Sequence, residues 1–547
     1  MYIYNNNEKI ILYNRYLFFK KQLIFYLIGK LSENEFKVFR LQKGIYRQKI
    51  SYMYRILIPY GFFSFKQSYM ISYIIYKFDK KYLHFTTRTN IQLNWFKIID
   101  SFYLIFYLLF VCLNSIQTSG NCVRNITVNY DIFFKNYIDN KSWCELIKQW
   151  FYLNSEFLFL PRKFKISITS SKIDNSFIKI NDLGLFIKKN LTNNLLIDFF
   201  VGGGLGRTPL RGLSFIKNIH WKNILNYCNT IIKIYNINGY RDNIYKARIK
   251  IFIKFISLNK FYFFIKNEIY FSNKNLYILN EKEINKFYLC IYDKKNYNII
   301  NYPFLIKKIK YNIFFSDWLI LNIEPFKDYI INITLLIKWF NSPPGDINYI
   351  QLKILFYIFT IINCNYFFIN NRQNIILESK NIYIYNLYIN LKYFFFFIYN
   401  INSIFNIVSC PGKDFCSLAN SESISLSIFL QNLFLDYNTI IKLNFFNINI
   451  SGCINSCAHH HISNLGFLGL KKNEISYYQF LIGGDNNFNN LLFSNILGPS
   501  LSFESILLNF IKFLKKYLKI KKNNEFFIDT YNKFGFIFFK NYIYNND

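Results

Sequence analysis

Alanine and acidic residues are scarce in this sequence. Its 547 residues include three alanines, and 31 aspartates and glutamates stand against 66 lysines and arginines. Aromatic residues, in contrast, make up 21% of the chain. A coding sequence rich in A and T would favour Phe, Tyr, Ile, Asn and Lys in this way. General residue propensities are therefore weak guides here, and the few glycines, prolines and cysteines carry more information.

Several functional classes lack their sequence signals. The longest apolar run, residues 102–113, is shorter than the roughly 20 residues that span a bilayer, so we expect no membrane association. The N-terminal residues lack the basic start and apolar core of a signal peptide. Lysines are spread along the chain, so the net charge of +35 predicts no nucleic-acid partner. Ten cysteines without an export signal indicate metal ligation in a reducing cytoplasm.

Four cysteines form two close pairs in the last third of the chain. Five residues separate Cys410 from Cys416, and three separate Cys453 from Cys457. Two pairs of thiolates are typical of a metal site. Zinc sites prefer tighter pairs, whereas an iron–sulfur cube accepts wider ones. Spacing alone leaves three interpretations open: an iron–sulfur cluster, a zinc site and four unrelated buried thiols.

Segments of the first half of the chain recur 284 residues later. Pro59-Tyr-Gly61 returns as Pro343-Pro-Gly345, and Arg88 returns as Arg372. A shared offset of this kind indicates two tandem copies of one unit. We therefore expect an α+β fold with a pseudo-twofold axis. Each copy is expected to pair a helix with a following strand, at residues 64–76 and 83–93 in the first copy and 348–361 and 367–377 in the second.

The residues around the cysteines resemble a known family. Segments 409–420 and 450–461 are similar to the cluster-binding segments of the sirohaem-dependent nitrite and sulfite reductases, and within them to the bacterial assimilatory sulfite reductase haemoprotein (beta) subunit. The resemblance implies that sirohaem and a [4Fe–4S] cluster are the cofactors. It also implies four cluster ligands, the last of them shared with the sirohaem iron: Cys410, Cys416, Cys453 and Cys457.

The same resemblance implies residues that face the substrate and the sirohaem. On their own, Arg55 reads as an edge residue facing water, and Lys163 and Lys165 as a solvated pair. A loop rich in glycine exposes backbone N–H groups to an anion. The family match assigns the substrate to Arg55, Arg124, Lys163 and Lys165. It assigns the sirohaem to Thr86, Thr87, Arg88, Asn90, Gly202, Gly203, Gly204, Gly206, Arg207 and Cys457.

The family also implies a division of the chain into paired half-domains. Residues 1–45 are expected to form a helical N-terminal extension, with a capping box at Ser32 and Glu35, and residues 239–248 to form a helix. The half-domains are a ferredoxin-like copy at 46–115, a sirohaem-binding copy at 116–310, a second ferredoxin-like copy at 311–395, and a [4Fe–4S] and sirohaem-binding copy at 396–547. Three histidines at 459–461 are expected to pack beside the cofactors without ligating metal.

The function implied is the six-electron reduction of sulfite to sulfide in sulfur assimilation. Assimilatory nitrite reduction to ammonia is the alternative within the family. A drifted scaffold protein without activity is the alternative outside it. The sequence lacks a flavin or nicotinamide fingerprint, so we expect electrons from a separate donor, either a flavoprotein reductase subunit or a ferredoxin.

Overall fold

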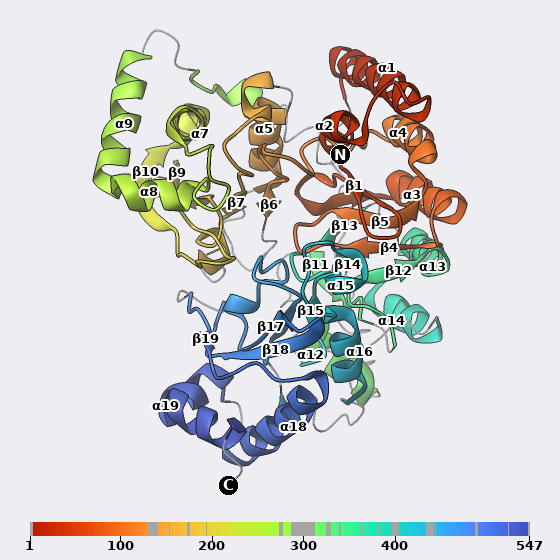
Figure 1. Cartoon of the computed structure of the whole chain (residues 1–547), viewed down its shortest axis with the longest axis vertical. Coiled ribbons are helices and arrows are strands. Elements are labelled where there is room, and N and C mark those ends of the chain that lie inside the picture. Colours follow the sequence, from red (N-terminus) through yellow and green to blue (C-terminus); the bar gives the residue numbers. More distant parts are fainter. Residues whose placement is uncertain are drawn as a thin grey trace.

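A computed structural model places most of the chain in four β-sheets with helices packed around them (Figure 1). The predicted domain boundaries at residues 310 and 395 lie outside the described residues. The structure describes residues 4–128, 140–152, 154–171, 175–192, 194–272, 277–285, 312–323, 330–338, 341–362, 364, 366–380, 383–394, 404–433, 442–443, 445–486, 491–522 and 525–544.

The N-terminal segment is helical, as predicted. Helix α1 (Asn6–Leu27) is followed by α2 (Glu33–Gln42). The Ser32 side chain caps the Glu35 N–H, and the Glu35 carboxylate accepts from the Ser32 N–H in return. This reciprocal pair satisfies backbone donors that the first helical turn leaves free.

Two sheets are built from the ferredoxin-like segments, and each contains a strand of the other copy. The first sheet ends with β12 (Asp346–Asn348), which pairs with β4 (Tyr82–Phe85). The second ends with β3 (Phe62–Ser64), which pairs with β13 (Tyr366–Ile369). The strands of the first sheet, in order, are β1 (Ile45–Arg47), β2 (Tyr52–Ile56), β5 (Ile91–Phe96), β4 (Tyr82–Phe85) and β12 (Asp346–Asn348). The second sheet has β11 (Ile330–Leu335), β14 (Ile375–Lys380), β13 (Tyr366–Ile369) and β3 (Phe62–Ser64).

The helices that follow the exchanged strands join the two copies in one core. Helix α3 (Phe65–Phe78) packs on α13 (Tyr349–Ile361), and the Phe65 and Phe359 rings stack 5.7 Å apart. Buried side chains from both copies form a single hydrophobic cluster. The two ferredoxin-like segments therefore make one body, which α4 (Ser101–Phe110), α12 (Ile313–Asn322) and α14 (Ile384–Tyr393) complete.

The segment predicted as one strand at residues 83–93 is two strands joined by a turn. Thr86 Oγ1 accepts hydrogen bonds from the N–H groups of Arg88 and Asn90, and Thr89 takes a left-handed conformation with φ of 56°. A threonine side chain that bonds the backbone two residues on favours a turn over an extended strand. The second copy turns in the same way between β13 and β14, where Gln373 has φ of 61°.

The other two sheets share one topology, which confirms the pseudo-twofold repeat. In each, three parallel strands precede antiparallel ones. The first has β6 (Thr127–Val128), β7 (Ile166–Thr169), β8 (Leu183–Lys189), β9 (Leu195–Val201) and β10 (Leu213–His220). The second has β15 (Val408–Ser409), β16 (Ile448–Ser451), β17 (Leu465–Lys472), β18 (Ile475–Ile482) and β19 (Asn495–Ile496).

Helices cover both of these sheets. The longer ones are α5 (Asn140–Tyr152), α7 (Ile224–Asn238), α8 (Ile249–Ile256), α9 (Leu258–Phe271), α16 (Ser423–Leu433), α18 (Phe503–Ile520) and α19 (Phe527–Tyr544). Single turns are α6 (Asn175–Ile178), α15 (Gly412–Phe415) and the 3-10 segments Pro59–Gly61, Ile98–Asp100, Ser155–Leu158, Trp221–Asn223 and His460–Ile462. In the described part of the chain, no helix is long and apolar enough to cross a membrane.

Residues 239–248 are not the helix that the sequence predicts. Helix α7 ends before Gly239, and α8 begins at Ile249 with Arg248 as its N-cap. A Cβ at Gly239 would lie 2.4 Å from the Tyr235 carbonyl oxygen. Glycine at this position therefore allows the backbone to pass close to the last turn of α7 as it leaves the helix. The segment is a connection that carries Arg248 to the sheet.

Because each copy contributes a strand to the sheet of the other, we expect the two ferredoxin-like copies to unfold together. Phe63 lies on β3, is fully buried, and meets Phe367 of the other copy edge-on with ring centroids 4.8 Å apart. Phe63→Ala should lower the free energy of unfolding by about 3–5 kcal/mol. The measurement is chemical unfolding followed by fluorescence. Phe255→Ala, at a side chain that is 88% exposed, is the matched control and should change little. A loss below 1 kcal/mol for Phe63→Ala would contradict a shared core.

Candidate functional site

The four predicted cluster ligands lie on two neighbouring loops. Cys410 directly follows β15, and Cys453 follows β16 by two residues. These strands are parallel neighbours, so their carboxyl ends meet at one edge of the sheet. The Gly452 N–H donates to Cys410 Sγ at 3.2 Å, and the Cys410 N–H donates to the Ile450 carbonyl oxygen at 3.2 Å. The fold therefore brings together cysteines that are 43 residues apart in the chain.

Backbone N–H groups surround the thiols. Burial raises the pKa of Cys410 to about 12 and raises the pKa of Cys416 and Cys453. N–H groups act in the opposite direction: those of Gly452 and Gly412 at Cys410, of Leu418 and Ala419 at Cys416, and of Asn455 at Cys453. Donors aimed at sulfur stabilise the thiolate form that metal ligation needs.

Small residues allow the two loops to pack this closely. A Cβ at Gly452 would lie 2.7 Å from the Ser421 carbonyl oxygen and 3.1 Å from Gly412 Cα. Its third neighbour is Ala419, and Ala458 is fully buried. Two of the three alanines in the chain therefore lie at these loops, where larger side chains would push the cysteines apart.

Cys457 is near enough to the other three cysteines and to Lys163 to influence the pKa of each. Its charge adds to the rise in pKa that burial causes at Cys410, Cys416 and Cys453, and it opposes the fall in pKa that burial causes at Lys163. Its carbonyl oxygen accepts a hydrogen bond of 2.7 Å from Thr87 Oγ1, which belongs to the first copy. Among the described residues, no three or more His, Cys, Asp or Glu side chains are grouped to hold a single metal ion.

Arg55 and Arg124 converge on the carbonyl oxygen of Thr118. Arg55 Nη1 donates to it at 3.4 Å, and Arg124 Nη1 also donates to it. Arg55 is not at a sheet edge, because β2 pairs with both β1 and β5. Its guanidinium lies 5.2 Å from the centre of the Tyr46 ring. Burial acts to raise the pKa of Tyr46, but the charges of Arg55 and Arg124, together with hydrogen bonds to Ser119 and Arg124, lower that pKa.

Lys163 and Lys165 immediately precede β7 and are half-buried. Burial lowers the pKa of Lys163 to about 8, although Cys457 opposes the shift. Burial also holds the pKa of Lys165 well below its usual range, with help from Arg88, Lys163 and Arg248. Amines with lowered pKa values give up protons more readily near neutral pH. The two lysines, together with Arg88 and Arg124, whose charges help to lower these pKa values, form a cluster that we call the positive group.

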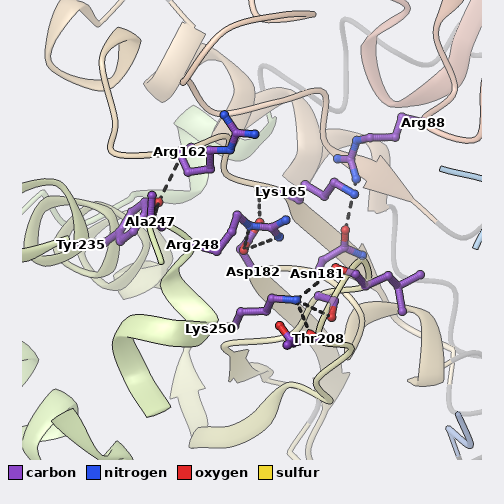
Figure 2. A network of polar contacts seen from close by, with 12 residues as sticks. Arg88, Arg162, Lys165, Asn181, Asp182, Thr208, Tyr235, Ala247, Arg248 and Lys250 are labelled. Carbon is purple, nitrogen blue, oxygen red and sulfur yellow. Dashed lines mark hydrogen bonds and ion pairs between the residues drawn. The ribbon is translucent and has the colours of Figure 1, made fainter. Parts of the chain in front are cut away.

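The turn at residues 86–90 connects this group to the first sheet. Arg88 Nη1 donates to Asn181 Oδ1 at 3.1 Å (Figure 2). Its Nη2 donates to the Asn125 carbonyl oxygen. Burial, followed by the charge of Arg124, lowers the pKa of Arg88 to about 9. The side chains of Thr86 and Asn90 make hydrogen bonds within the protein: Thr86 Oγ1 bonds the backbone of the turn, and Asn90 Oδ1 accepts from Asn125 Nδ2 at 2.8 Å.

The glycine-rich loop reaches the cysteine loop of the other copy. Gly206 lies close to the carbonyl oxygens of Ile454 and Asn455, and its own carbonyl oxygen is 3.2 Å from His461 Nε2. Two of the N–H groups predicted to face an anion are already paired: Gly202 donates to the Asp182 carbonyl oxygen and Gly204 to that of Leu210. A Cβ at Gly203 would lie 2.3 Å from the Lys179 carbonyl oxygen, so only glycine fits there.

Arg207 does not join the positive group. Its side chain is exposed and lies over the Tyr245 ring at 5.6 Å. The three histidines pack beside the cysteine loop. His459 is buried near Phe177, and burial, followed by Lys165 and Arg88, lowers the pKa of His459 to about 3.

Sequence reasoning missed three residues that complete the positive group. Arg248 donates to both oxygens of Asp182, at 2.7 and 2.8 Å, and Lys250 Nζ donates to the carbonyl oxygens of Gly204, Leu205 and Thr208 (Figure 2). Arg162 is the third, and its charge lowers the pKa of Lys163.

Two known protein-domain families match segments of this chain. The nitrite and sulphite reductase 4Fe-4S domain matches residues 119–273 and again residues 401–515. The nitrite/sulfite reductase ferredoxin-like half domain matches residues 46–100. The chain belongs to the nitrite and sulfite reductase family. The two matches to the 4Fe-4S domain model fall on the two topologically equal sheets.

Known members show how far the likeness extends. Ferredoxin–nitrite reductase of Synechococcus elongatus is 27% identical over 211 residues, which are 36% of this chain and 40% of that protein. The enzyme of the same name from Leptolyngbya laminosa is 25% identical over 231 residues, 40% of this chain and 45% of that protein. The chain thus matches less than half the length of these relatives. The NirA protein of Mycobacterium tuberculosis has the same fold, with a TM-score of 0.75 and 17% identity over 93% of this chain and 92% of that one.

The cofactors of this family are sirohaem and a [4Fe–4S] cluster, and the residues present fit them. Thiols with N–H donors suit the cluster, since such donors tune iron–sulfur sites. The positive group suits the carboxylates of sirohaem. Buried side-chain atoms without a hydrogen-bond partner in the structure include the Nε atoms of Arg55, Arg88 and Arg124. Buried donors of this kind are expected to find acceptors.

The cysteine quartet makes a direct prediction about iron content. Cys457→Ser removes the thiolate that lies next to the positive group, so the purified protein should lose its coupled visible spectrum and most of its iron. Cys122→Ser is the matched control, because Cys122 donates to the Ser119 carbonyl oxygen, outside the quartet, and serine can do the same. Iron analysis and visible absorption measure the outcome. An unchanged spectrum in Cys457→Ser would overturn the ligand assignment.

Proposed function

We propose that this protein reduces sulfite to sulfide by six electrons, at a sirohaem coupled to a [4Fe–4S] cluster. The observation that carries the proposal is the group of four cations beside Cys457. Arg55 and Arg124 share one carbonyl acceptor, and Lys163 and Lys165 lie two residues apart just before β7. Sulfite carries up to two negative charges near neutral pH and has three oxygens, so it suits several cationic donors.

The cofactors supply the electrons and the binding site for the sulfur atom. The chain supplies charge and protons. The planar guanidiniums of Arg55 and Arg124 can give fixed, paired contacts to oxygen. Lys163 and Lys165 have lowered pKa values, so their ammonium groups are suited to donate protons as oxygen leaves. Cys410, Cys416, Cys453 and Cys457 would hold the cluster.

Nitrite reduction to ammonia is the second candidate. It is favoured by the curated relatives, both of which are named ferredoxin–nitrite reductase. Nitrite is a monoanion with two oxygens, so it needs fewer cations than sulfite does. Within the family, sulfite reductases tend to keep both lysines, while nitrite enzymes tend to have asparagine at the second position. Lys165 is therefore the residue that separates the two candidates.

Replacing Lys165 by asparagine should reduce sulfite turnover far more than nitrite turnover. One charge-assisted contact is worth roughly 1.5–3 kcal/mol, so the kcat/KM for sulfite should fall about tenfold to a hundredfold. Asparagine is compatible with this strand position, because Asn447 occupies the matching place in the second copy. The measurement is the ratio of kcat/KM for the two anions with one artificial donor.

Two outcomes would replace sulfite by nitrite as the substrate. One is a wild-type protein that already prefers nitrite. The other is a Lys165→Asn variant with an unchanged ratio. Lys188→Asn is the control, since Lys188 pairs with Asp198 on the same sheet and away from the cysteines. It should leave both the ratio and the turnover as they are.

We infer that the electron donor is a separate acidic protein, a ferredoxin or a flavoprotein subunit. The net charge of +35 supports this, as does the surface next to the cysteine loop. There the exposed Lys49 donates to the Lys413 carbonyl oxygen at 3.1 Å, three residues before Cys416. Nine free cysteines in the described part of the chain support a cytoplasmic location.

Electron delivery by a protein donor should weaken as salt is raised. Charges on two protein surfaces are screened over about 8–10 Å at 0.1–0.15 M salt, so the apparent KM for the donor should rise between low and moderate salt. A small uncharged artificial donor serves as the control, and its KM should not change. An equally flat response with the protein donor would mean that the surface charge does not guide docking.

A further inference from the structure

The corresponding turns of the two ferredoxin-like copies each reach one loop of the cysteine quartet. In the first copy, Thr87 Oγ1 donates to the Cys457 carbonyl oxygen at 2.7 Å. In the second copy, Gln373 Nε2 donates to the Ser409 carbonyl oxygen at 3.1 Å. Ser409 ends β15 and directly precedes Cys410. The first and the last cysteine of the quartet are therefore both tied to the ferredoxin-like body.

The side-chain amide of Gln373 is buried and is held in one orientation. Its Nε2 also donates to the Phe85 carbonyl oxygen at 2.9 Å and lies 3.2 Å from His84 Nε2. Two carbonyl oxygens require a donor, so the amide nitrogen faces them. His84 Nε2 is then the acceptor, and the imidazole proton lies on Nδ1, 2.6 Å from Asp346 Oδ1.

Two features of Gln373 carry a cost in free energy. In the part of the chain that the structure describes, its Oε1 is buried and has no hydrogen-bond partner. Its backbone is left-handed, with φ of 61°, which is unfavourable for a residue with a side chain. Buried acceptors are normally paired, and strained backbone tends to lie near functional sites. We therefore look for the role of this residue in what its nitrogen holds.

The peptide group between Ser409 and Cys410 is fixed at both ends. Its carbonyl oxygen accepts from Gln373, and its N–H donates to the Ile450 carbonyl oxygen at 3.2 Å. A peptide group is planar, so hydrogen bonds at its two ends fix its rotation about the chain. That rotation sets the direction in which Cys410 leaves the strand, where its Sγ accepts from the Gly452 N–H at 3.2 Å.

We propose that Gln373 is a positioning residue for the iron–sulfur cluster: its amide N–H groups fix the peptide before Cys410 and thereby the direction of this thiolate. The proposal rests on the proposed function in taking Cys410 as a cluster ligand. It also connects this ligand to the exchange of strands, because His84 on β4 pairs with Asp346 on β12. The residues that meet at Gln373 thus come from both copies.

Hydrogen exchange of the purified protein, read by mass spectrometry, tests this positioning. Gln373→Met keeps the length of the side chain but removes its donors, so exchange in residues 409–416 should be about threefold to tenfold faster, the effect of one lost hydrogen bond. Thr87→Val removes the bond to the other loop and should speed exchange in residues 453–460 instead. A general loosening of the structure would speed both segments in both variants, and that result overturns the proposal.

Gln67→Met is the matched control for the loss of a buried amide. Gln67 lies on α3, and its Nε2 donates to the Val111 carbonyl oxygen at 3.1 Å. Its replacement should leave exchange in residues 409–416 as it is. If Gln373→Met does not fold, Gln373→Asn replaces it, because asparagine tolerates the left-handed backbone and its shorter amide does not span the same acceptors. Unchanged exchange in residues 409–416 of the folded variant contradicts the proposal.

The cluster itself gives the second measurement. Transfer of iron from the holoprotein to a chelator, followed by visible absorption, should be about threefold to tenfold faster in Gln373→Met than in the wild type or in Gln67→Met. Equal rates would refute a role in holding the cluster. A wild-type protein without a cluster would contradict the proposed function, and the exchange experiment would then decide on Gln373 alone. Neither measurement turns over a substrate, so both apply whether the anion is sulfite or nitrite.

Discussion

The reciprocal exchange of β3 and β12 is the constraint on which the rest of the structure depends. Each strand completes the sheet of the other copy, and the helices that follow pack on one another. The site needs this, because its parts come from both copies. The turn with Thr87 and the glycine-rich loop belong to the first copy, and the cysteine loop they touch belongs to the second. A hydrogen bond between Thr87 and Cys457 is possible only if the two copies have one fixed relative position.

Much of this architecture could be predicted from sequence, because repeats and cysteine spacing survive heavy drift in composition. The helices at α3 and α13 follow from the recurring segments, and the pairing of the cysteine loops follows from their family resemblance. The turn at residues 86–90 could not be predicted from alternation, since Thr86 and Thr89 are residues that favour strands. The Thr86 hydroxyl bonds the backbone locally and overrides that preference.

The site was predictable where a motif is short and local, and not where distant residues combine. Lys163 and Lys165 are adjacent in sequence to their strand, so their grouping could be expected. Arg248 is 66 residues from Asp182 and is the last residue of a segment expected to be helical. Its pairing depends on where α7 ends and on the path back to the sheet, which no local pattern encodes. The two copies also differ at the decisive positions, so repeat matching points to the place but not to the charge.

The exchanged strands also set an order of events while the chain is being made. Strand β4 leaves the ribosome early, but its neighbour β12 is encoded about 260 residues later. At roughly 5–20 residues per second, the edge of β4 waits on the order of 13 to 50 seconds for its partner. An unpaired sheet edge invites pairing with other chains. During translation, then, the nascent first half depends on chaperones or on its own helices to cover an edge that only the second half can close.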